Sequence, residues 1–358
     1  MLNLAILFGG LSSEHEISCL SAAAVLRNLD GEKYRVYAVG ITREGRWLLY
    51  ENADPDKVQN QSWEKEPSLV PALLSPDRGI HGLTVLRESG AEHIRLDCVF
   101  PVLHGFGGED GTIQGLCTLA GIPFVGPGVA ASANAMDKSL TKLIVETTGV
   151  PQAAYYLARA DAFAKAPEAV AQAAAEKLGA WPVFVKPCSS GSSVGVTRAD
   201  DLPQLLEGLR EAFRWDRKVL VEAFIDGHEI EVAVLGNDEP VASVAGEIAP
   251  TQTFYTFDAK YRDESSALYI PAHIPDDAMA TVRESAVRIY TALGCKGLSR
   301  VDFFCTYQDN KIVFNEINTI PGFTSISMYP KLFDHAGIPF PALIDRLIEL
   351  AMEEKAHG

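Results

Sequence analysis

The chain has 358 residues, which is enough for two or three domains with buried cores. Hydrophobic residues make up 47% of it and charged residues 22%, proportions that exclude a disordered or low-complexity protein. The formal net charge of −16 argues against nucleic acid as a partner, because a duplex-binding protein needs a basic face.

The N-terminal residues 1–127 are predicted to form a parallel α/β domain. The apolar run LNLAILFGG predicts a strand, and SSEHEISCLSAAAVLRNL has the apolar spacing of a helix that Ser12 or Ser13 could cap. YRVYAVGIT and LDCVFPVLHG predict two further strands, GTIQGLCTLAG predicts a helix, and the tract from Glu51 to Gly79 is expected to be a mostly exposed excursion. This alternation implies a mostly parallel sheet whose carboxyl edge carries the site.

Two further domains are predicted, residues 128–222 and residues 223–358. In the first, SANAMDKSLTKLIVETTG predicts one helix, WPVFVKP and KVLVEAFI predict strands, and DDLPQLLEGLREAF predicts a second helix. From HEIEVAVLG onward the strands are expected to be antiparallel, and the chain closes with the helix FPALIDRLIELAMEEK. The segment from Thr251 to His273 is long and polar, which is typical of a lid or binding loop.

Neither a membrane anchor nor a disulfide framework is indicated. The start, MLNLAILFGG, lacks the basic region of a signal peptide, and no apolar run approaches the ~20 residues that a spanning helix needs. We therefore expect a cytoplasmic protein without a membrane partner. The six cysteines show no C-x-x-C spacing and are expected to be buried thiols; a nucleophilic role for Cys188 is disfavoured because the sequence places no histidine to activate it.

The segment SRVDFFCTYQDNKIVFNEIN predicts a β-hairpin near the C-terminus. If Tyr307 pairs with Lys311 across its turn, Asp302 lies directly opposite Glu316. Two carboxylates that face each other at roughly 5 Å between Cβ atoms destabilise a sheet unless a cation lies between them. The hairpin therefore predicts a metal site.

The same register places Arg300 opposite Asn318 on that face. A donor set of oxygens without sulfur selects Mg²⁺ or Mn²⁺ over zinc. The alternative is a solvent-facing patch of salt bridges, against which the apolar surroundings RVDFF and IVFNEIN argue, because uncompensated charge is unfavourable there.

Three single residues are further site candidates. Lys186 ends an apolar strand before the turn CSSGSSVGV, where a cation and backbone N–H groups can hold phosphate oxygens, although a plain surface loop would look similar and the lysine precedes the glycines, unlike a P-loop. His104 stands where a strand gives way to a glycine-rich turn, and Glu14 could hold a substrate ammonium group near a helix start. The N-terminal glycine pair lacks the third glycine of a dinucleotide fingerprint, so a nicotinamide oxidoreductase is not expected.

Taken together, seven segments resemble the D-alanine–D-alanine ligases of the ATP-grasp superfamily: LFGGLSSEHEIS, LHGFGGEDGTIQG, MDK, VKPCSSGSSVG, FDAKY, SRVDFF and NEINTIPGFTSISMYP. The resemblance spans nearly the whole chain and implies a fold of the α/β and α+β classes, in which the N-terminal parallel α/β domain precedes a two-part ATP-grasp fold. It implies an ADP-forming ligation of two D-alanines to D-alanyl-D-alanine through an acyl phosphate, for peptidoglycan synthesis, cell-wall biogenesis and cell shape. ATP and two Mg²⁺ ions, which Mn²⁺ could replace, are the implied cofactors, and a homodimer the implied assembly.

The resemblance also assigns residues to the nucleotide and the metals. Lys138, Lys186 and Lys260 match lysines near the ATP phosphates, and the matches for the adenine and ribose contacts are Glu222, Ala223, Ile225 and Glu229. Ala223 departs from the lysine often found there, although backbone atoms can supply the adenine hydrogen bonds. The matches for the Mg²⁺ ligands are Asp302, Glu316 and Asn318.

The amino acid sites follow in the same way. Glu14 matches the residue that holds the ammonium of the first D-alanine, with Ser192 and Tyr261 as its partners in a hydrogen-bonded triad and His104 beside the substrate carboxylate. Arg300 and the N–H of Gly322 are implied to stabilise the oxyanion, and Ser327 and Met328 to receive the second amino acid.

The resemblance leaves two alternatives for the second substrate. The tract from Glu44 to Gly90 lengthens the first domain, as in the subgroup that includes vancomycin-resistance-type ligases, so a D-alanine–D-serine or D-lactate ligase is the alternative. Met328 stands where those relatives often carry arginine and offers a hydroxyl no donor, and Tyr261 also fits dipeptide formation, so D-alanyl-D-alanine is the expected product. A nucleotide-binding protein without turnover is the alternative from another class.

Overall fold

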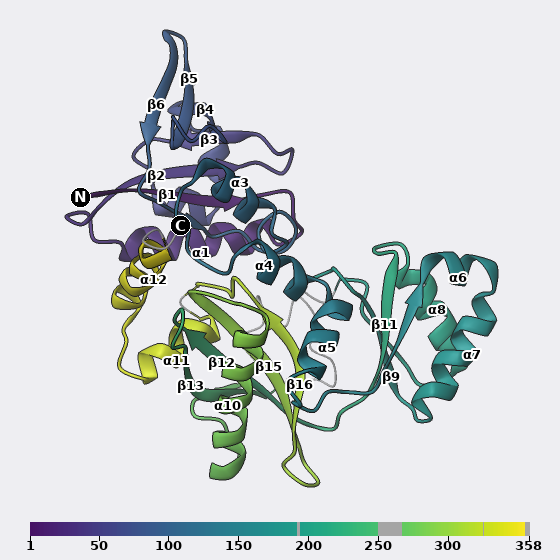
Figure 1. Ribbon diagram of the computed structural model, residues 1–358. Coiled ribbons are helices and arrows are strands. Elements are labelled where there is room, and N and C mark those ends of the chain that lie inside the picture. The colour runs from purple at the N-terminus through teal and green to yellow at the C-terminus, as the bar shows by residue number, and fades with distance from the viewer. Residues whose placement is uncertain (192–193, 250–266, 325, 355–358) are drawn as a thin grey trace.

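The computed structural model describes residues 1–191, 194–249, 267–324 and 326–354 (Figure 1). The predicted site residues Ser192, Lys260 and Tyr261, and most of the predicted lid from Thr251 to His273, lie outside the described residues. Within those residues, no helix is both long and apolar enough to cross a membrane.

The first sheet has seven strands in the order β6-β5-β4-β3-β2-β1-β7. Its strands are β1 (Leu2–Gly9), β2 (Tyr34–Ile41), β3 (Trp47–Tyr50), β4 (Leu69–Leu74), β5 (Gly82–Arg87), β6 (Gly90–Arg95) and β7 (Cys98–Pro101). Strand β1 pairs in parallel with both β2 and β7, whereas β3 to β6 add antiparallel strands beyond β2. The predicted α/β class is thus confirmed, but the sheet is mixed, not mostly parallel.

The predicted excursion from Glu51 to Gly79 contains one of these antiparallel strands. It holds α2 (Pro55–Gln59), the 3₁₀ helix η1 (Ser62–Lys65) and strand β4, which pairs with β3 and β5. Most of its residues are exposed, as expected, but Trp63 is fully buried and packs edge-on against Phe8 of β1 with 5.0 Å between ring centroids. A long apolar side chain thus ties the excursion to the core.

Two helices accompany the first sheet, α1 (His15–Asn28) and α3 (Thr112–Ala120). The prediction that Ser12 or Ser13 caps α1 is wrong, because Glu14 is the N-cap residue and no side chain caps the helix. The Ser12 hydroxyl instead accepts a hydrogen bond from the Glu14 N–H at 3.1 Å. This bond fixes the turn from which Glu14 enters the site.

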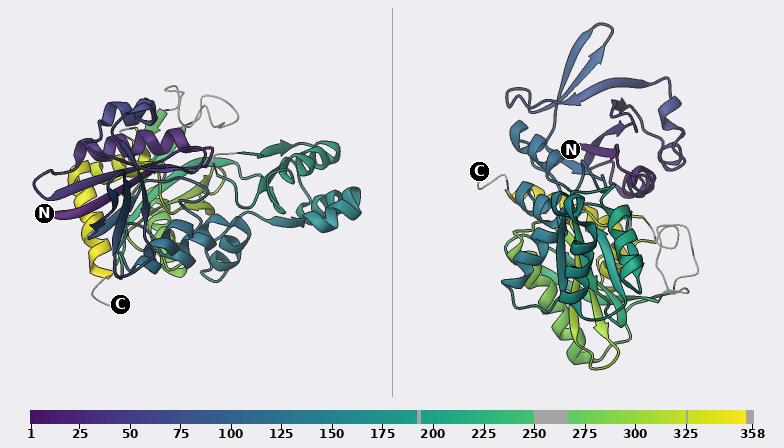
Figure 2. Two further views of the ribbon diagram at one scale, coloured as in Figure 1. Left: turned by 90° about the horizontal axis from the view of Figure 1, so that it is seen from above. Right: turned by 90° about the vertical axis from the view of Figure 1, so that its right-hand side faces the viewer.

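The second sheet is antiparallel, with the order β10-β9-β11-β8, and its helices lie on one side of it as an arm that projects from the rest of the molecule (Figure 2). Its elements are β8 (Tyr155–Arg159), α6 (Ala160–Lys165), α7 (Pro167–Leu178), β9 (Val183–Pro187), β10 (Thr197–Ala199), α8 (Leu202–Ala212) and β11 (Lys218–Ala223).

The single helix predicted before this sheet is wrong: there are two, α4 (Val129–Met136) and α5 (Lys138–Glu146). The break falls at Asp137, which has extended backbone angles (φ −87°, ψ 98°). Its carboxylate accepts hydrogen bonds from the N–H groups of Ser139 and Leu140 and pairs with Lys218. Capping of α5 therefore outweighs continuation of the helix at this residue.

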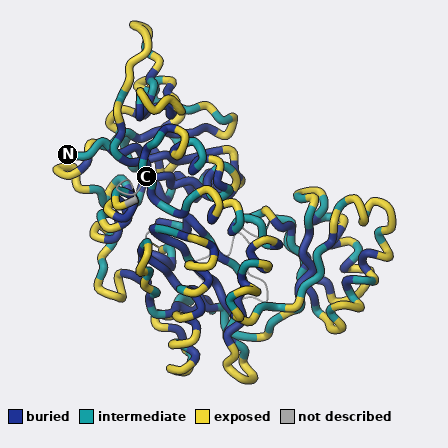
Figure 3. The backbone as a smooth tube through the Cα atoms, viewed as in Figure 1, coloured by how far each residue is buried: buried dark blue, intermediate teal, exposed yellow. Residues whose placement is uncertain are grey.

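The third sheet is also antiparallel, as predicted, with the order β14-β13-β12-β15-β16. Its elements are β12 (Gly227–Leu235), β13 (Val241–Ala249), β14 (Ala267–Tyr269), α10 (Asp276–Ala292), β15 (Leu298–Thr306), β16 (Ile312–Asn318), α11 (Met328–His335) and α12 (Phe340–Glu354). Strands β12 and β15 are its most buried part (Figure 3). Both Lys33 and Tyr34 contact Asp345 of α12, at 2.6 and 2.8 Å, so the last helix joins the first sheet.

The hairpin β15–β16 has the predicted pairs but not the predicted turn. Thr306, not Tyr307, donates its N–H to the carbonyl of Lys311, at 3.1 Å. A bulge directly after Asp302 then shifts the register by one residue, so that Asp302 lies opposite Glu316, as predicted. The three predicted domains and their boundaries remain a prediction. Strand β11 of the second sheet ends one residue past the second predicted boundary, at Ala223.

Candidate active site

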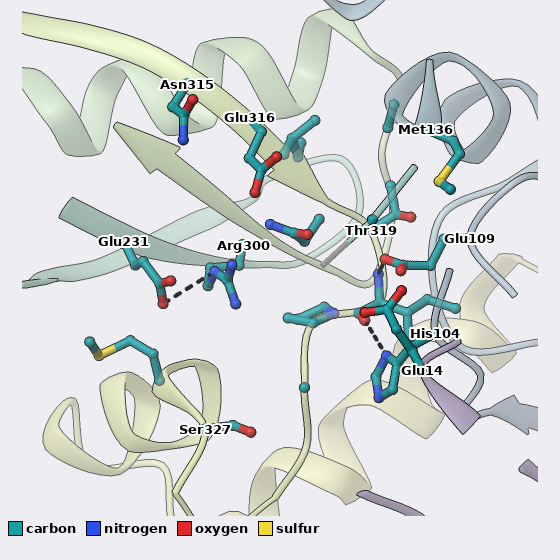
Figure 4. Close-up of a pocket in the computed structure, with 18 of the residues that line it drawn as sticks. Glu14, His104, Glu109, Met136, Glu231, Arg300, Asn315, Glu316, Thr319 and Ser327 are labelled. Carbon is teal, nitrogen blue, oxygen red and sulfur yellow. Dashed lines mark hydrogen bonds and ion pairs between the residues drawn. The ribbon is translucent and has the colours of Figure 1, made fainter. Parts of the chain in front are cut away.

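A cavity of about 500 Å³ lies where the three sheets meet, and its lining includes residues from each part of the chain (Figure 4). It includes eleven of the predicted site residues: Glu14, His104, Lys138, Lys186, Glu222, Arg300, Glu316, Asn318, Gly322, Ser327 and Met328. Of the other predicted residues that the structure describes, Ala223, Ile225, Glu229 and Asp302 are not in the lining.

Glu14 is buried at the start of α1, and two glycines approach its carboxylate closely. A Cβ atom at Gly105 would lie 2.5 Å from Glu14 Oε2, and one at Gly191 would lie 2.8 Å from the same atom. Gly105 also has φ +66°, a conformation in which a larger residue is strained. The glycine turns after β7 and after β9 are thus both needed to leave room for this carboxylate.

His104 is buried between the first sheet and the loop that follows β16. Its Nε2 lies 3.1 Å from the Ser21 hydroxyl, and its Nδ1 lies 2.9 Å from the carbonyl of Ile320. Since only a protonated Nδ1 can bond a carbonyl, the ring donates from Nδ1 and accepts at Nε2. Burial lowers the pKa of His104, against the opposing charge of Glu14, which favours this neutral form.

Glu109 is a site residue that the sequence analysis missed, although its motif LHGFGGEDG was noted. Its carboxylate accepts the N–H of Gly105 at 2.8 Å and the N–H of Ile320 at 3.0 Å (Figure 4). Burial raises its pKa to about 7, and the charge of Glu14 adds to the effect. One carboxyl group therefore joins the turn beside Glu14 to the loop after β16.

Lysines surround Glu222 on the other side of the cavity. Lys186 contacts one oxygen of Glu222 at 2.6 Å, and Lys142, also missed by the sequence analysis, contacts the other at 2.5 Å. Burial alone would raise the pKa of Glu222, but the charges of Lys186 and Lys142 outweigh it and hold that pKa at about 2. Lys138 donates a hydrogen bond to the carbonyl of Ser190 at 2.8 Å, so it contacts the loop that follows β9.

The predicted adenine and ribose contacts lie beside this cluster. Ala223 ends β11 and donates its N–H to the carbonyl of Ala154 at 2.9 Å. Ile225 lies between β11 and β12, and Glu229 lies on β12 opposite Ile248.

Arg300 is the centre of the predicted metal site. It forms a two-bond contact with Asp302, both bonds 2.7 Å long, and Asp302 also accepts a bond from Asn318 at 3.0 Å. Arg300 contacts Glu231, a third residue missed by the sequence analysis, at 3.2 Å (Figure 4). Glu316 is the carboxylate of the predicted set that lines the cavity.

This set fits Mg²⁺ by donor type, because two carboxylates and an amide oxygen lie on one face of the hairpin. The described residues hold no group of three or more His, Cys, Asp or Glu side chains placed for a metal ion. Substrate phosphates usually complete such magnesium sites.

The predicted site for the second substrate lies at the start of α11. The Ser327 hydroxyl accepts the N–H of Thr324 at 3.1 Å and would lie 2.9 Å from a Cβ atom at Gly322, so a larger residue at that position would displace the hydroxyl. Met328 is buried, and its sulfur would lie 2.5 Å from a Cβ atom at Gly246 of β13. Met328 therefore presents an apolar surface to this part of the cavity, beside the polar side chains of Thr324 and Ser327.

All six cysteines are buried, as predicted. Burial raises the pKa of the Cys188 thiol to about 12, so this thiol is a poor nucleophile at neutral pH.

Comparisons with known proteins agree with this arrangement. Residues 3–127 match the family model described as the D-Ala D-Ala ligase N-terminus, and residues 144–349 match the C-terminus model. The D-alanine–D-alanine ligase of Caldicellulosiruptor bescii is 47% identical over 360 residues, which cover 99% of this chain and 96% of that protein.

Two solved structures are similar over nearly their whole length. The VanG D-Ala:D-Ser ligase from Enterococcus faecalis has a TM-score of 0.88 at 39% identity and covers 98% of this chain and 99% of its own. The D-alanine–D-alanine ligase from Coxiella burnetii has a TM-score of 0.86 at 35% identity, and the match covers 100% of this chain and 97% of that chain.

An α/β domain followed by two antiparallel sheets around a lysine-lined cavity defines an ATP-grasp enzyme. The family models and the 47% identity go further, and the chain belongs to the D-alanine–D-alanine ligase family. Enzymes of this family use ATP and Mg²⁺ and act in peptidoglycan synthesis.

Proposed function

We propose that this chain joins two D-alanines to D-alanyl-D-alanine and converts one ATP to ADP and phosphate in the same reaction. The observation that supports this most is that one cavity holds an anionic end at Glu14, a lysine cluster at Glu222 and a cationic centre at Arg300. An ammonium group, a triphosphate and a developing oxyanion need these three environments.

The first step is phosphoryl transfer. With its ammonium group at Glu14, the first D-alanine presents its carboxylate toward the cavity, and that carboxylate attacks the γ-phosphate of ATP in line. Lys186 and Arg300 neutralise charge on the transferring group. The products are an acyl phosphate and ADP.

The second step is acyl transfer. The free amine of the second D-alanine attacks the carbonyl of the acyl phosphate, and phosphate leaves with the oxygen that bridged it to carbon. Arg300 and the N–H of Gly322 stabilise the tetrahedral oxyanion, and both residues line the cavity. Neutral His104 and the carboxyl group of Glu109 hold the loop after β16 that carries Gly322.

Asp302, Glu316 and Asn318 would hold Mg²⁺, which when bound neutralises phosphate charge and orients the phosphoryl group. Arg300 donates two hydrogen bonds to Asp302 and so fixes the orientation of that carboxylate before substrate binds. Lys138 and Lys186 would bind ATP phosphates, while Glu222, Ala223, Ile225 and Glu229 would contact adenine and ribose. Lys260, Ser192 and Tyr261 are proposed for the roles that the sequence implies.

The second substrate is proposed to be D-alanine and not D-serine. The buried Met328 gives the site an apolar wall without a hydrogen-bond donor, so a substrate hydroxyl gains nothing there. The relative named D-alanine–D-alanine ligase is 47% identical and the structure named D-Ala:D-Ser ligase is 39% identical, which supports the same choice.

A cytoplasmic location and a homodimer are further parts of the proposal, supported by the sequence resemblance. Sedimentation velocity at micromolar concentration measures the assembly. A species of 38.7 kDa at all concentrations would contradict the dimer.

The chemistry is tested with D-alanine labelled with ¹⁸O in its carboxylate. An acyl phosphate pathway transfers one labelled oxygen from the substrate into each phosphate released, which mass spectrometry detects. Phosphate without the label, formed together with dipeptide, would contradict the acyl phosphate.

A further inference from the structure

Lys142 is a buried cation that neither the sequence analysis nor the mechanism above uses. It is 2% exposed, and among the described residues it is the only lysine or arginine that is buried. A buried lysine is unfavourable unless an anion compensates it. Its position in the cavity lining therefore calls for an explanation.

The sequence places Lys142 four residues after Lys138 on α5, so the two side chains lie on the same face of one helix. Both line the cavity. Like charges at this spacing repel each other, which makes the arrangement unfavourable for α5 by itself. The gain must come from the partner that the fold brings to this face.

That partner is Glu222. Its Oε1 contacts Lys142 at 2.5 Å, while its Oε2 contacts Lys186 at 2.6 Å, so one carboxylate bridges the two ammonium groups. Lys142 also lies 5.3 Å from the centre of the Tyr155 ring, whose face attracts cations. Elsewhere in the described chain, no other carboxylate lies within ion-pair distance of Lys142.

The charges in this cluster do not cancel. Glu222 and Lys186 alone would form a neutral pair, whose attraction for a phosphate group would be weak. Addition of Lys142 leaves the three side chains with a net charge of +1, inside a part of the protein where electrostatic interactions are little screened.

We propose that Lys142 is a positioning residue for the nucleotide: it holds Glu222 and supplies the charge that keeps Lys186 available to the phosphates. This inference rests on the proposed function, because it takes Lys186 as a phosphate ligand.

Two further carboxylates, in addition to Glu222, attract the ammonium group of Lys186, which is why the extra positive charge of Lys142 is needed. Burial lowers the pKa of Lys186, but Glu222, Glu316 and Glu229 raise it, and the net shift is upward, so Lys186 remains protonated. In the protein without substrate, three carboxylates thus compete with phosphate for the lysine.

The test compares binding of Mg-ADP and of adenosine, which lacks phosphate, by calorimetry. The ratio of the dissociation constant of adenosine to that of Mg-ADP reports the contribution of the phosphates, because effects on the adenine contacts cancel. Lys142→Met should lower this ratio tenfold or more, mainly through weaker Mg-ADP binding.

Lys177→Met is the matched control. Lys177 is exposed and lies 5.6 Å from the centre of the same Tyr155 ring, but Glu222 is not its partner in the described structure. This variant should keep the wild-type ratio within twofold. Lys142→Arg, which retains the charge, should lie between wild type and Lys142→Met, and it serves as the test if the methionine variant does not fold.

The double variant Lys142→Met/Glu222→Gln separates charge from packing. It loses one positive and one negative charge, so the cluster returns to +1, and its ratio should return to within threefold of wild type. A ratio as low as that of Lys142→Met would overturn the inference, as would an equal loss of Mg-ADP and adenosine binding in the single variant. If the wild-type chain binds no Mg-ADP, the proposed function falls as well, whereas wild-type binding with an unchanged Lys142→Met ratio overturns this inference alone.

Discussion

Gly105→Ala should disable the site for the first D-alanine while leaving the fold intact. The new Cβ atom would lie 2.5 Å from Glu14 Oε2 and 2.6 Å from the Ser12 hydroxyl. The Glu14 carboxylate must then retreat by about 0.9 Å, the difference between 2.5 Å and the 3.4 Å at which ordinary contact begins. Since a misplacement of about 1 Å can reduce catalysis roughly a hundredfold, we expect kcat/KM for D-alanine to fall by about that factor.

The matched control is Gly107→Ala in the same turn. Gly107 has φ +83°, close to the φ +66° of Gly105, but a Cβ atom there meets nothing within 4 Å. Both variants should lose about 1 kcal/mol of stability from the left-handed backbone, measured by urea unfolding. Only Gly105→Ala should lose activity. Equal kcat/KM values for the two variants in a coupled ADP assay would refute the role of Glu14 and of its close glycine neighbour.

Three further outcomes are expected. Glu316→Gln should lower turnover by orders of magnitude while the circular dichroism spectrum is retained, because Glu316 is the proposed metal ligand that lines the cavity; unchanged turnover at saturating Mg²⁺ would contradict this. In a competition between D-alanine, D-serine and D-lactate, with products resolved by mass, D-alanyl-D-alanine should dominate; a dominant mixed product would show that Met328 does not set the preference. The Glu222 carboxyl, whose pKa falls from its ordinary 4.5 to about 2, stabilises the fold above pH 4.5 and loses this contribution as the pH falls toward 2. Urea unfolding should therefore show a smaller acid-induced loss of stability for Glu222→Gln than for wild type, and equal losses would refute the assignment.

The hairpin shows what the sequence could and could not reveal. The pairs Asp302–Glu316 and Arg300–Asn318 were predicted from a turn whose register was wrong by one residue. A bulge after Asp302 shifts the register by one residue, so the two predicted pairs form nevertheless. A bulge leaves little trace in the alternation of apolar residues, so its presence was not predictable. Asp302 is also compensated by a protein cation, Arg300, which pairs with Glu231 as well.

The residues that were missed depend on contacts distant in sequence. Lys142 and Glu222 are 80 positions apart in the sequence. Glu109 accepts a hydrogen bond from the N–H of Ile320, which lies 211 positions further along the chain. Their local sequences show only charges on a helix or in a turn, which are usually solvated. The spacing of Lys138 and Lys142 was the available signal, but only the fold shows that this helix face is buried.

The most direct test of the account is product formation by the purified chain. With ATP, Mg²⁺ and D-alanine together, the account predicts D-alanyl-D-alanine, ADP and phosphate in equal amounts, and no product when any one of the three is left out. Absence of both dipeptide and ADP from the complete mixture would contradict it.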